Sequence, residues 1–366
     1  MNILFFTESG MGVSALTTEQ ICVMKGLNGG TFGVVSGLEQ EPGLIERMRR
    51  EGIELLELVG LECHRNWRRH VGLIRDFVRR NGIEVIHVQT NWELVLCFFV
   101  KLALGWSHRV RIVYTLHAFR NDRGVMVYVA AALMNLALLV MADRVVCISD
   151  YTRGWFRLVG FKTVVLPLGV DSRFFLEKWS FVEDAGMSMV YLAQFRKGKR
   201  HDWIIRAFAD FVDKSEDGTA RLFLPGEGPT RRRMMGLAEK LGVADRVVFP
   251  GRCSKEGIFG LLSAVNIAVV ASCSETFGQC IAEPFVMGKL VISTPVGIAP
   301  EIIRDGVNGF IFDSAEELSE ILCNIAGNKD LMRRMGWKNF EMRGRFDWRK
   351  IVECLMDEYE KTQTQN

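Results

Sequence analysis

The chain alternates short apolar runs with longer segments in which apolar residues recur at helical spacing. The first half carries short runs at residues 3–6, 31–35, 54–58, 85–88, 112–116, 145–148 and 163–166. The second half repeats the pattern at residues 189–193, 222–225, 247–249, 267–270, 290–292 and 310–312. Such β-α alternation predicts an α/β fold built on parallel, doubly wound sheets.

A change in composition at residues 169–185, where glycine and mixed charges interrupt the pattern, predicts a domain boundary. At 366 residues the chain is also longer than one hydrophobic core usually supports. Two α/β domains joined by a linker leave a cleft between facing strand ends, and such clefts are common ligand sites. We therefore expect two domains with a ligand site between them.

The composition is that of a folded globular protein, with 49% apolar and 24% charged residues. The net charge of +3 is too small to indicate nucleic acid as a partner. Nine cysteines are scattered without a C-x-x-C pair, and several, including Cys147 and Cys280, lie in apolar runs. This favours buried, reduced thiols over disulfides. Because the first residues resemble a strand rather than a secretion signal, we expect a cytoplasmic protein.

An apolar stretch at residues 125–142 is interrupted only by Tyr128 and Asn135 and barely reaches the length of a bilayer. The chain continues almost at once into the apolar run at residues 145–148, which is typical of a central strand. A spanning helix would separate the strands of one sheet across a membrane. We therefore expect a buried or interface-lying helix.

A second stretch, residues 65–80, has one apolar face at helical spacing and a remaining face that is dense in arginine. The apolar face consists of Trp67, Val71, Ile74 and Val78. Helices of this kind rest on anionic lipid or lie solvated on a protein surface, and the sequence leaves both possibilities open.

Two carboxylates eight positions apart, Glu275 and Glu283, bracket a turn and the start of a helix between the apolar runs 267–271 and 290–293. In open α/β sheets, ligands bind at the carboxyl ends of strands beside helix N-termini, whose N–H groups favour anions. Eight helical residues advance about 12 Å, which suits an extended phosphate-containing ligand held at both ends. Two solvated carboxylates on a surface helix are the alternative.

Four cations, Arg196, Lys197, Lys199 and Arg200, occupy five positions between a predicted strand and a predicted helix. Cations at the carboxyl end of a strand would neutralise a diphosphate, with arginine as a bidentate fork and lysine as a point charge. A solvated loop is the alternative.

Glycine turns follow other strands, at Gly10 and Gly12 after the first run, at Gly226, and directly before Arg252. Glycine lets the backbone approach a ligand closely. The first loop lacks the third glycine of a dinucleotide-binding fingerprint, so an NAD site is disfavoured. The loops of the second half are predicted to point from one sheet edge toward the same volume.

These residues, in this order, resemble the retaining GT-B glycosyltransferases of family 4. The resemblance extends from the first strand to about residue 360. It rests on the E-x7-E pair with Phe277 and Gly278 after the first acid, and on the segments 142–149, 167–171, 288–297, 300–303, 305–309 and 346–348.

The resemblance implies a GT-B fold of two Rossmann-like, doubly wound parallel-sheet domains that face each other across a cleft. The acceptor-side domain is expected at residues 1–170, and the nucleotide-sugar donor domain at residues 171–345. Residues 346–366 are expected to form a helix that crosses back to the first domain.

The resemblance also implies roles for single residues. Glu275 would contact hydroxyls of the transferred sugar, Glu283 the ribose of the nucleotide, and His117 the reacting sugar. Arg196 and Lys199 would hold the diphosphate in place of a metal. Further donor-binding residues are expected at Gly10, Gly12, Gly226, Arg252, Phe277, Gly278 and Gln279.

Three positions depart from the family pattern. Gln194 replaces an arginine, which leaves open which of the four cations contacts phosphate. Leu168 replaces an asparagine at an expected hinge. Pro284 removes a helix N–H directly after Glu283 and is expected to bend that helix.

The implied enzyme is a hexosyltransferase that transfers a sugar from a nucleotide-sugar, with UDP as the family's usual nucleotide, to an acceptor hydroxyl. The anomeric configuration is retained, and no obligatory metal or other cofactor is expected. The apolar and basic stretches of the first domain point to a lipid-linked glycan acceptor in bacterial O-antigen, capsule or lipopolysaccharide synthesis, with peripheral contact at the inner membrane face. A non-catalytic nucleotide-sugar-binding module, a phosphorylase and an epimerase are the alternatives.

Overall fold

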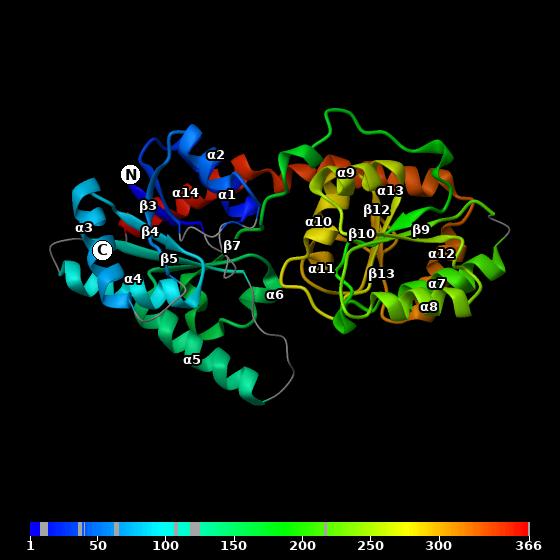
Figure 1. Ribbon diagram of the computed structural model, residues 1–366, viewed down its shortest axis with the longest axis horizontal. Coiled ribbons are helices and arrows are strands. Elements are labelled where there is room, and N and C mark those ends of the chain that lie inside the picture. The colour runs from blue at the N-terminus through cyan, green and yellow to red at the C-terminus, as the bar shows by residue number, and fades with distance from the viewer. Residues whose placement is uncertain are drawn as a thin grey trace. The chain divides into compact units, whose positions relative to one another are not determined.

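The computed structural model describes residues 1–7, 14–35, 39, 41–61, 66–105, 109–117, 125–215 and 218–364. The chain divides into two compact units (Figure 1). The first unit contains Met1–Gly169 and Asp347–Asn366, and the second contains Val170–Phe346. Each unit is described by itself.

Among the described residues, the first unit has one parallel seven-stranded sheet in the order β3-β2-β1-β4-β5-β6-β7. β1 lies inside the sheet, because Ile3 pairs with Thr31 on one side and with Val85 on the other. The strands are β1 Ile3–Phe6, β2 Thr31–Val35, β3 Glu54–Glu57, β4 Val85–Val88, β5 Arg111–Leu116, β6 Arg144–Cys147 and β7 Thr163–Val165.

Helices cover both faces of this sheet: α1, α2 and α14 lie on one face, and α3, α4 and α5 on the other (Figure 1). The Ser14 side chain caps α1, and Thr90 with Glu93 forms a capping box at the start of α4. The helices are α1 Ala15–Leu27, α2 Leu44–Arg50, α3 Trp67–Asn81, α4 Asn91–Leu104, α5 Val125–Met141, α6 Asp150–Arg153, the 3-10 helix η2 Arg157–Lys162 and the tail helix α14 Trp348–Thr364.

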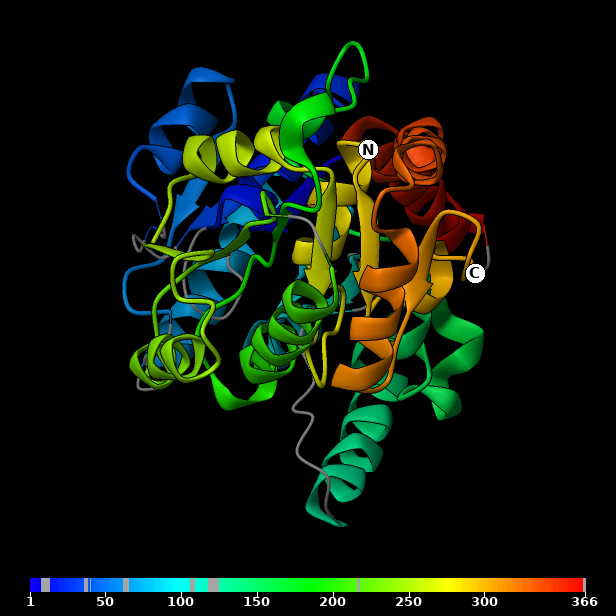
Figure 2. The same ribbon diagram turned by 90° about the vertical axis from the view of Figure 1, so that its right-hand side faces the viewer.

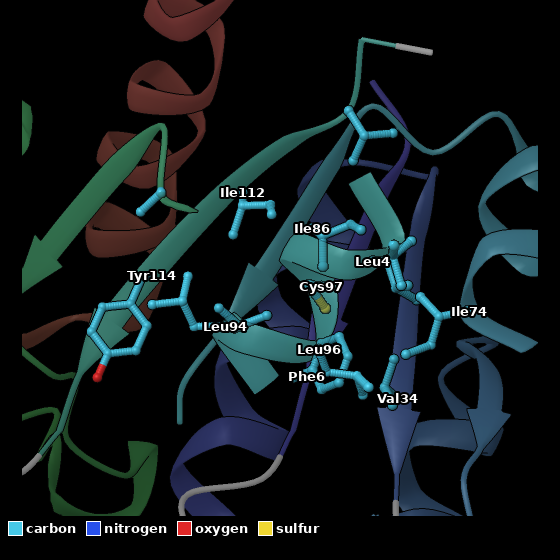
Figure 3. Packing of buried hydrophobic residues seen from close by; sticks show 14 of the residues in the cluster. Leu4, Phe6, Val34, Ile74, Ile86, Leu94, Leu96, Cys97, Ile112 and Tyr114 are labelled. Atoms are coloured by element: carbon cyan, nitrogen blue, oxygen red, sulfur yellow. The ribbon is translucent and has the colours of Figure 1, made fainter. Parts of the chain in front are cut away.

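The core of the first unit lies between its sheet and helices α3 and α4 (Figure 3). Leu4, Ile86 and Ile112 come from three adjacent strands, Ile74 from α3 and Cys97 from α4, and all five are fully buried. Because side chains alternate between the faces of a strand, the residues between these positions point to the opposite face, toward α1 and α14. That second face carries a polar cluster described below.

Among the described residues, the second unit has one parallel six-stranded sheet in the order β10-β9-β8-β11-β12-β13. Helices α7, α8 and α12 cover one face of it, and α9, α10 and α13 cover the other (Figures 1 and 2). The strands are β8 Met189–Val190, β9 Leu222–Pro225, β10 Val247–Gly251, β11 Ile267–Val270, β12 Leu290–Ser293 and β13 Gly309–Ile311.

The helices of the second unit follow its strands in alternation, as the periodicity predicts. They are α7 His201–Lys214, α8 Arg231–Lys240, α9 Lys255–Ala264, α10 Gln279–Val286, α11 Ala299–Ile302, α12 Ala315–Ile325 and α13 Lys329–Met342. Short 3-10 helices occur at η3 Ser172–Phe174, η4 Glu183–Ala185, η5 Lys197–Lys199 and η6 Arg343–Phe346.

The predicted α/β class with parallel sheets is confirmed, whereas several predicted strand ends are wrong. β8 ends at Val190 instead of residue 193, because only Met189 and Val190 pair with the neighbouring strands. β10 continues to Gly251 instead of residue 249. Ladder pairing sets the end of a strand, and apolar character can extend beyond it.

The apolar stretch at residues 125–142 forms helix α5, which runs over Val125–Met141. Of the helices in the described ranges, none is long and apolar enough to cross a membrane. The thiols of Cys97 and Cys147 are buried, and that of Cys280 is partly buried; all three are free.

Candidate active site

An ion pair between Lys199 and Glu275 lies at the carboxyl edge of the second unit's sheet. Lys199 ends η5 in the loop after β8, and Glu275 lies in the loop after β11, the strand that pairs with β8. The Lys199 Nζ donates a hydrogen bond to Glu275 Oε1. The two side chains are 26% and 15% exposed, so the pair is accessible to a ligand from solvent.

Three hydroxyl side chains hold this pair in place. Ser272 Oγ donates to Glu275 Oε1 at 2.6 Å, and the Tyr191 hydroxyl lies 2.8 Å from Ser272 Oγ and 3.0 Å from the Lys199 carbonyl oxygen. Thr294 Oγ1 donates to the Ser272 carbonyl at 2.7 Å. Burial raises the pKa of Tyr191 well above its usual value, so this hydroxyl stays protonated. The carboxylate of Glu275 is therefore oriented by residues that follow three strands, β8, β11 and β12.

The backbone also joins the two loops. The Cys273 N–H donates to the Gly198 carbonyl at 2.8 Å, which fixes the cation loop against the loop that carries Glu275. The next strand, β9, ends in a turn at Gly226, whose φ of 133° suits glycine. A Cβ at Gly226 would lie 2.3 Å from the Ala193 carbonyl oxygen, so only glycine fits this close approach.

Gly278 directly precedes helix α10 as its N-cap, in the left-handed region with φ 99°. The preceding residue, Phe277, is buried, and its carbonyl accepts the Ile298 N–H at 2.9 Å. At Gly297, a Cβ would lie 2.1 Å from that carbonyl oxygen. The first turn of α10, which starts at Gln279, is therefore held rigidly beside Glu275, in the position where helix N–H groups favour anions.

Glu283 lies farther along α10 and is only 5% exposed. Burial raises the pKa of its carboxyl, although Lys255 Nζ lies 3.2 Å away and opposes that shift. Lys255 itself lies 5.8 Å from the centre of the Phe174 ring. α10 continues past Pro284 to Val286, so the proline does not end the helix. Contact of Glu283 with a ribose stays a prediction.

The four cations of the loop after β8 differ in their surroundings. Lys199 contacts Glu275, while Arg196 and Lys197 are exposed. Arg200 adopts a left-handed conformation with φ 47° and stacks over Trp203 at 4.2 Å. The geometry singles out Lys199 as the cation next to the candidate sugar-contacting acid. Contact between any of these cations and a phosphate stays a prediction.

In the sheet order of the second unit, the predicted donor residues follow one another along one edge. Arg252 follows β10, Gly226 follows β9, Lys199 follows β8 and Glu275 follows β11. Arg252 is exposed. Gly10 and Gly12, the donor residues predicted in the first unit, lie outside the described residues.

His117 lies just after β5 in the first unit and is half-buried. Its Nε2 contacts Gln89 Oε1, and the Gln89 amide nitrogen donates to the Phe6 carbonyl at 2.7 Å. The contact with the Phe6 carbonyl shows that the amide nitrogen of Gln89 faces Phe6 and that its oxygen faces His117. Because this oxygen can only accept a hydrogen bond, His117 carries its proton on Nε2. Burial lowers the pKa of His117 to about 4, and the ring is neutral at neutral pH.

A second polar pair, His87 and Thr115, lies two residues earlier than Gln89 and His117 along the same two strands, and on the same face of the sheet. His87 is fully buried; its Nε2 lies 2.7 Å from Thr115 Oγ1, and its Nδ1 contacts the Tyr359 hydroxyl of the tail helix α14. Burial, with a smaller contribution from His117, lowers the pKa of His87 to about 3. We call His87, Gln89, Thr115 and His117 the polar ladder.

Sequence reasoning missed Gln89, His87, Ser272 and Tyr191. A weak signal exists for the ladder, because its polar residues recur at every second position at the ends of two adjacent apolar runs. No comparable signal marks Ser272 or Tyr191.

Two family profiles match the chain. Residues 177–342 match the family described as Glycosyl transferases group 1, and residues 39–174 match the family described as Glycosyltransferase Family 4. The chain belongs to the family 4 glycosyltransferases. It is therefore a transferase, as the motif resemblance predicted.

This glycosyltransferase is similar to N-acetyl-alpha-D-glucosaminyl L-malate synthase of Bacillus anthracis, with 24% identity over 279 residues that cover 71% of this chain and 70% of that protein. Among solved structures, HepE of Anabaena in complex with UDP has a TM-score of 0.79 at 16% identity, with 99% and 100% of the two chains covered. The lipopolysaccharide outer core galactosyltransferase WaaB has a TM-score of 0.75 at 14% identity, with 99% of each chain covered. These structures, together with the two parallel-sheet units, confirm the GT-B fold.

Proposed function

We propose that this glycosyltransferase moves a hexose from a UDP-sugar to an acceptor hydroxyl and retains the anomeric configuration. The observation that carries the proposal is the Lys199–Glu275 pair, which places a cation and a carboxylate side by side at the carboxyl edge of β8 and β11. A diphosphate needs positive charge, and sugar hydroxyls need an acceptor, so this pair matches the two halves of a nucleotide-sugar. The UDP complex of HepE supports this choice of nucleotide.

The transition state places growing negative charge on the leaving diphosphate. Lys199, with Arg196 beside it on an exposed loop, is proposed to stabilise this charge together with the first N–H groups of α10. These groups act in place of a metal, and we propose that no metal or other cofactor is required. An oxygen of the leaving phosphate takes the proton of the acceptor hydroxyl on the same face, which retains the configuration.

His117 is assigned to the reacting sugar. Because its proton is on Nε2, its Nδ1 is an acceptor and can receive a hydrogen bond from a hydroxyl group. A neutral imidazole adds no charge near the anomeric carbon. Gly226, Arg252, Phe277, Gly278, Gln279 and Glu283 are assigned to donor binding, together with Gly10 and Gly12 from the sequence.

For the acceptor, we propose a lipid-linked glycan used in synthesis of a bacterial surface polysaccharide at the inner face of the cytoplasmic membrane. The similarity to WaaB, which acts on lipopolysaccharide outer core, supports this class. A small soluble acceptor is the second candidate, because the Bacillus anthracis relative is named for L-malate.

The test measures UDP release from a panel of UDP-sugars with lipid-linked and soluble acceptors, and NMR of the product reports the anomeric configuration. Glu275→Gln is expected to lower transfer by about 1000-fold, since it removes a charged contact to the sugar, while the fold is unchanged. Glu239→Gln on exposed helix α8 is the matched control and retains activity. Near-normal transfer by Glu275→Gln would refute the site.

Other outcomes identify the alternatives. Conversion of the donor without acceptor indicates an epimerase, and cleavage that depends on inorganic phosphate indicates a phosphorylase. Donor binding without any turnover indicates a binding module. Full activity in the presence of EDTA is expected, and loss of activity that Mn²⁺ restores would contradict the assignment of the diphosphate to Lys199 and Arg196.

A further inference from the structure

Helix α5 exposes an apolar face on the first unit. Its sequence contains no charged residue at all. The exposed side chains include Leu133 and Val140, each 64% exposed. We call the set Tyr128, Val129, Leu133, Leu136, Leu139 and Val140 the α5 apolar face.

The opposite face of α5 is firmly docked. Ala131, Asn135 and Leu138, and Ala142 just after the helix, recur at helical spacing and are buried. The Asn135 amide donates to the carbonyls of Ala131 and Trp155 at 2.8 Å each, which ties the helix to the segment before η2. The exposure of the α5 apolar face therefore belongs to a folded, anchored helix.

The neighbouring 3-10 helix η2 extends this surface. Leu158 and Phe161 are 69% and 71% exposed, and η2 packs against α5. Lys162 at the end of η2 donates to the Leu139 and Ala142 carbonyls at 2.8 and 2.9 Å, so a cation lies at the C-terminal end of α5. Exposed Arg157 begins η2.

Basic and aromatic side chains lie on the same side of the first unit's sheet as this apolar surface. The Tyr128 and Trp155 rings lie 6.0 Å apart at the N-terminal part of α5. Helix α3, with exposed Arg68, Arg69 and Arg79, lies on the same face of the sheet, next to α4 (Figure 1). Apolar groups flanked by aromatic rings and arginines are typical of surfaces that lie in the interface of an anionic bilayer.

We propose that the α5 apolar face, with Leu158 and Phe161, inserts into the headgroup region of an anionic membrane and holds the enzyme there. A helix of 17 residues is about 26 Å long and lies in the plane of the interface. A second copy of the chain is a less suitable occupant, because in a two-fold pair the same surface meets itself, and its flanking cations find no anionic partner.

The experiment measures flotation of the full chain with vesicles of phosphatidylcholine and phosphatidylglycerol in equal parts, and with phosphatidylcholine alone. The insertion variant combines Leu133→Gln, Leu136→Gln and Val140→Gln, since glutamine is compatible with a helix. We expect it to bind anionic vesicles at least about tenfold more weakly than the wild type, at low and at high salt. The control combines Leu27→Gln, Met235→Gln and Met342→Gln, which are exposed apolar positions on other helices, and binds normally.

Two further variants separate the apolar contribution of η2 to membrane binding from the electrostatic contribution of the α3 arginines. Leu158→Ser with Phe161→Ser leaves α5 unchanged and is also expected to weaken binding. Arg68→Gln with Arg69→Gln and Arg79→Gln is expected to weaken binding only at low salt, because salt screens this attraction. Failure of the wild type to float, or loss of a concentration-dependent dimer in the insertion variant with no change in flotation, would overturn the proposal.

This surface is independent of the proposed donor chemistry, and the readouts are separate. The insertion variant is expected to transfer sugar normally to a short acceptor that carries no lipid. A wild type that floats but transfers no sugar would contradict the proposed function and leave the membrane surface supported.

Discussion

The carboxyl edges of the two sheets carry polar side chains that differ in charge and in burial. In the second unit, the edge holds a charged pair, Lys199 and Glu275, that is still partly in contact with solvent. In the first unit, the polar ladder is neutral, and His87, Gln89 and Thr115 are buried. Both arrangements lie at the carboxyl ends of parallel strands: the charged pair is in the loops after β8 and β11, and the ladder occupies the last positions of β4 and β5 and the residues that follow them.

This difference shows how one fold can serve two tasks. A partly solvated ion pair can exchange partners with a charged ligand, because solvent compensates each charge during the exchange. Buried polar groups must be satisfied within the protein, and they keep one arrangement because leaving any of them unpaired is costly. The second unit is thus suited to bind a charged donor, and the ladder is suited to orient one histidine.

The largest effect is expected from breaking the charged pair. Lys199→Met is predicted to lower turnover by at least about 100-fold, since it removes the positive charge that stabilises the leaving diphosphate and leaves Glu275 without its cation. Steady-state UDP release measures this loss. Lys197→Met, on the same loop and exposed, is the control and is expected to have a small effect.

A double-mutant cycle sharpens this result. Lys199→Met combined with Glu275→Gln is expected to lose less activity than the two single losses multiplied, because the residues are in contact. If Arg196→Met lowers turnover more than Lys199→Met does, the diphosphate lies on the other side of the loop and the assignment of Lys199 is wrong.

A smaller effect is expected from the ladder. Gln89→Leu removes the acceptor for the His117 Nε2 proton and allows the other tautomer, so turnover is predicted to fall at least about tenfold. Gln89→Glu keeps an acceptor but adds a negative charge, which raises the pKa of His117 above its present value of about 4.

The pH profile distinguishes this positioning role from a merely structural one. Neutral His117 is the active form, so activity falls as the pH drops through its pKa, and Gln89→Glu is expected to move this acidic limb of kcat/KM to higher pH. An acidic limb that does not move in Gln89→Glu would show that Gln89 does not control the protonation of His117.

The sequence predicted the elements far better than it predicted the partners of the site residues. Runs such as Ile267–Val270 are read directly from their apolar character, because burial of both sheet faces demands it. Glu275 and the cation loop were each predicted by their place after a strand. Their ion pair depends on β8 and β11 being neighbours, which is a matter of strand order rather than of local sequence.

The residues that sequence reasoning missed depend on distant partners. Ser272 orients Glu275 with the help of Tyr191, which lies 81 positions away, and Gln89 is held by Phe6 at 83 positions. Ser272, a single polar residue after an apolar run, has no periodicity that marks it. Only the folded sheet shows that it has a partner.

The smallest expected effect is a change in the pH dependence of the free energy of unfolding, and it comes from His87 of the polar ladder rather than from the charged pair of the second unit. The pKa of His87 is about 3 in the folded protein against an ordinary 6.5, so below pH 6.5 the unfolded chain binds a proton that the folded one does not. The free energy of unfolding therefore falls as the pH decreases, by about 1.4 kcal/mol per pH unit for this group. His87→Gln is expected to remove this part of the slope between about pH 6 and pH 4, as measured by urea denaturation. Stability at pH 8 serves as the reference, because His87 is neutral there in both states, and an unchanged slope would show that the ladder does not hold this histidine neutral.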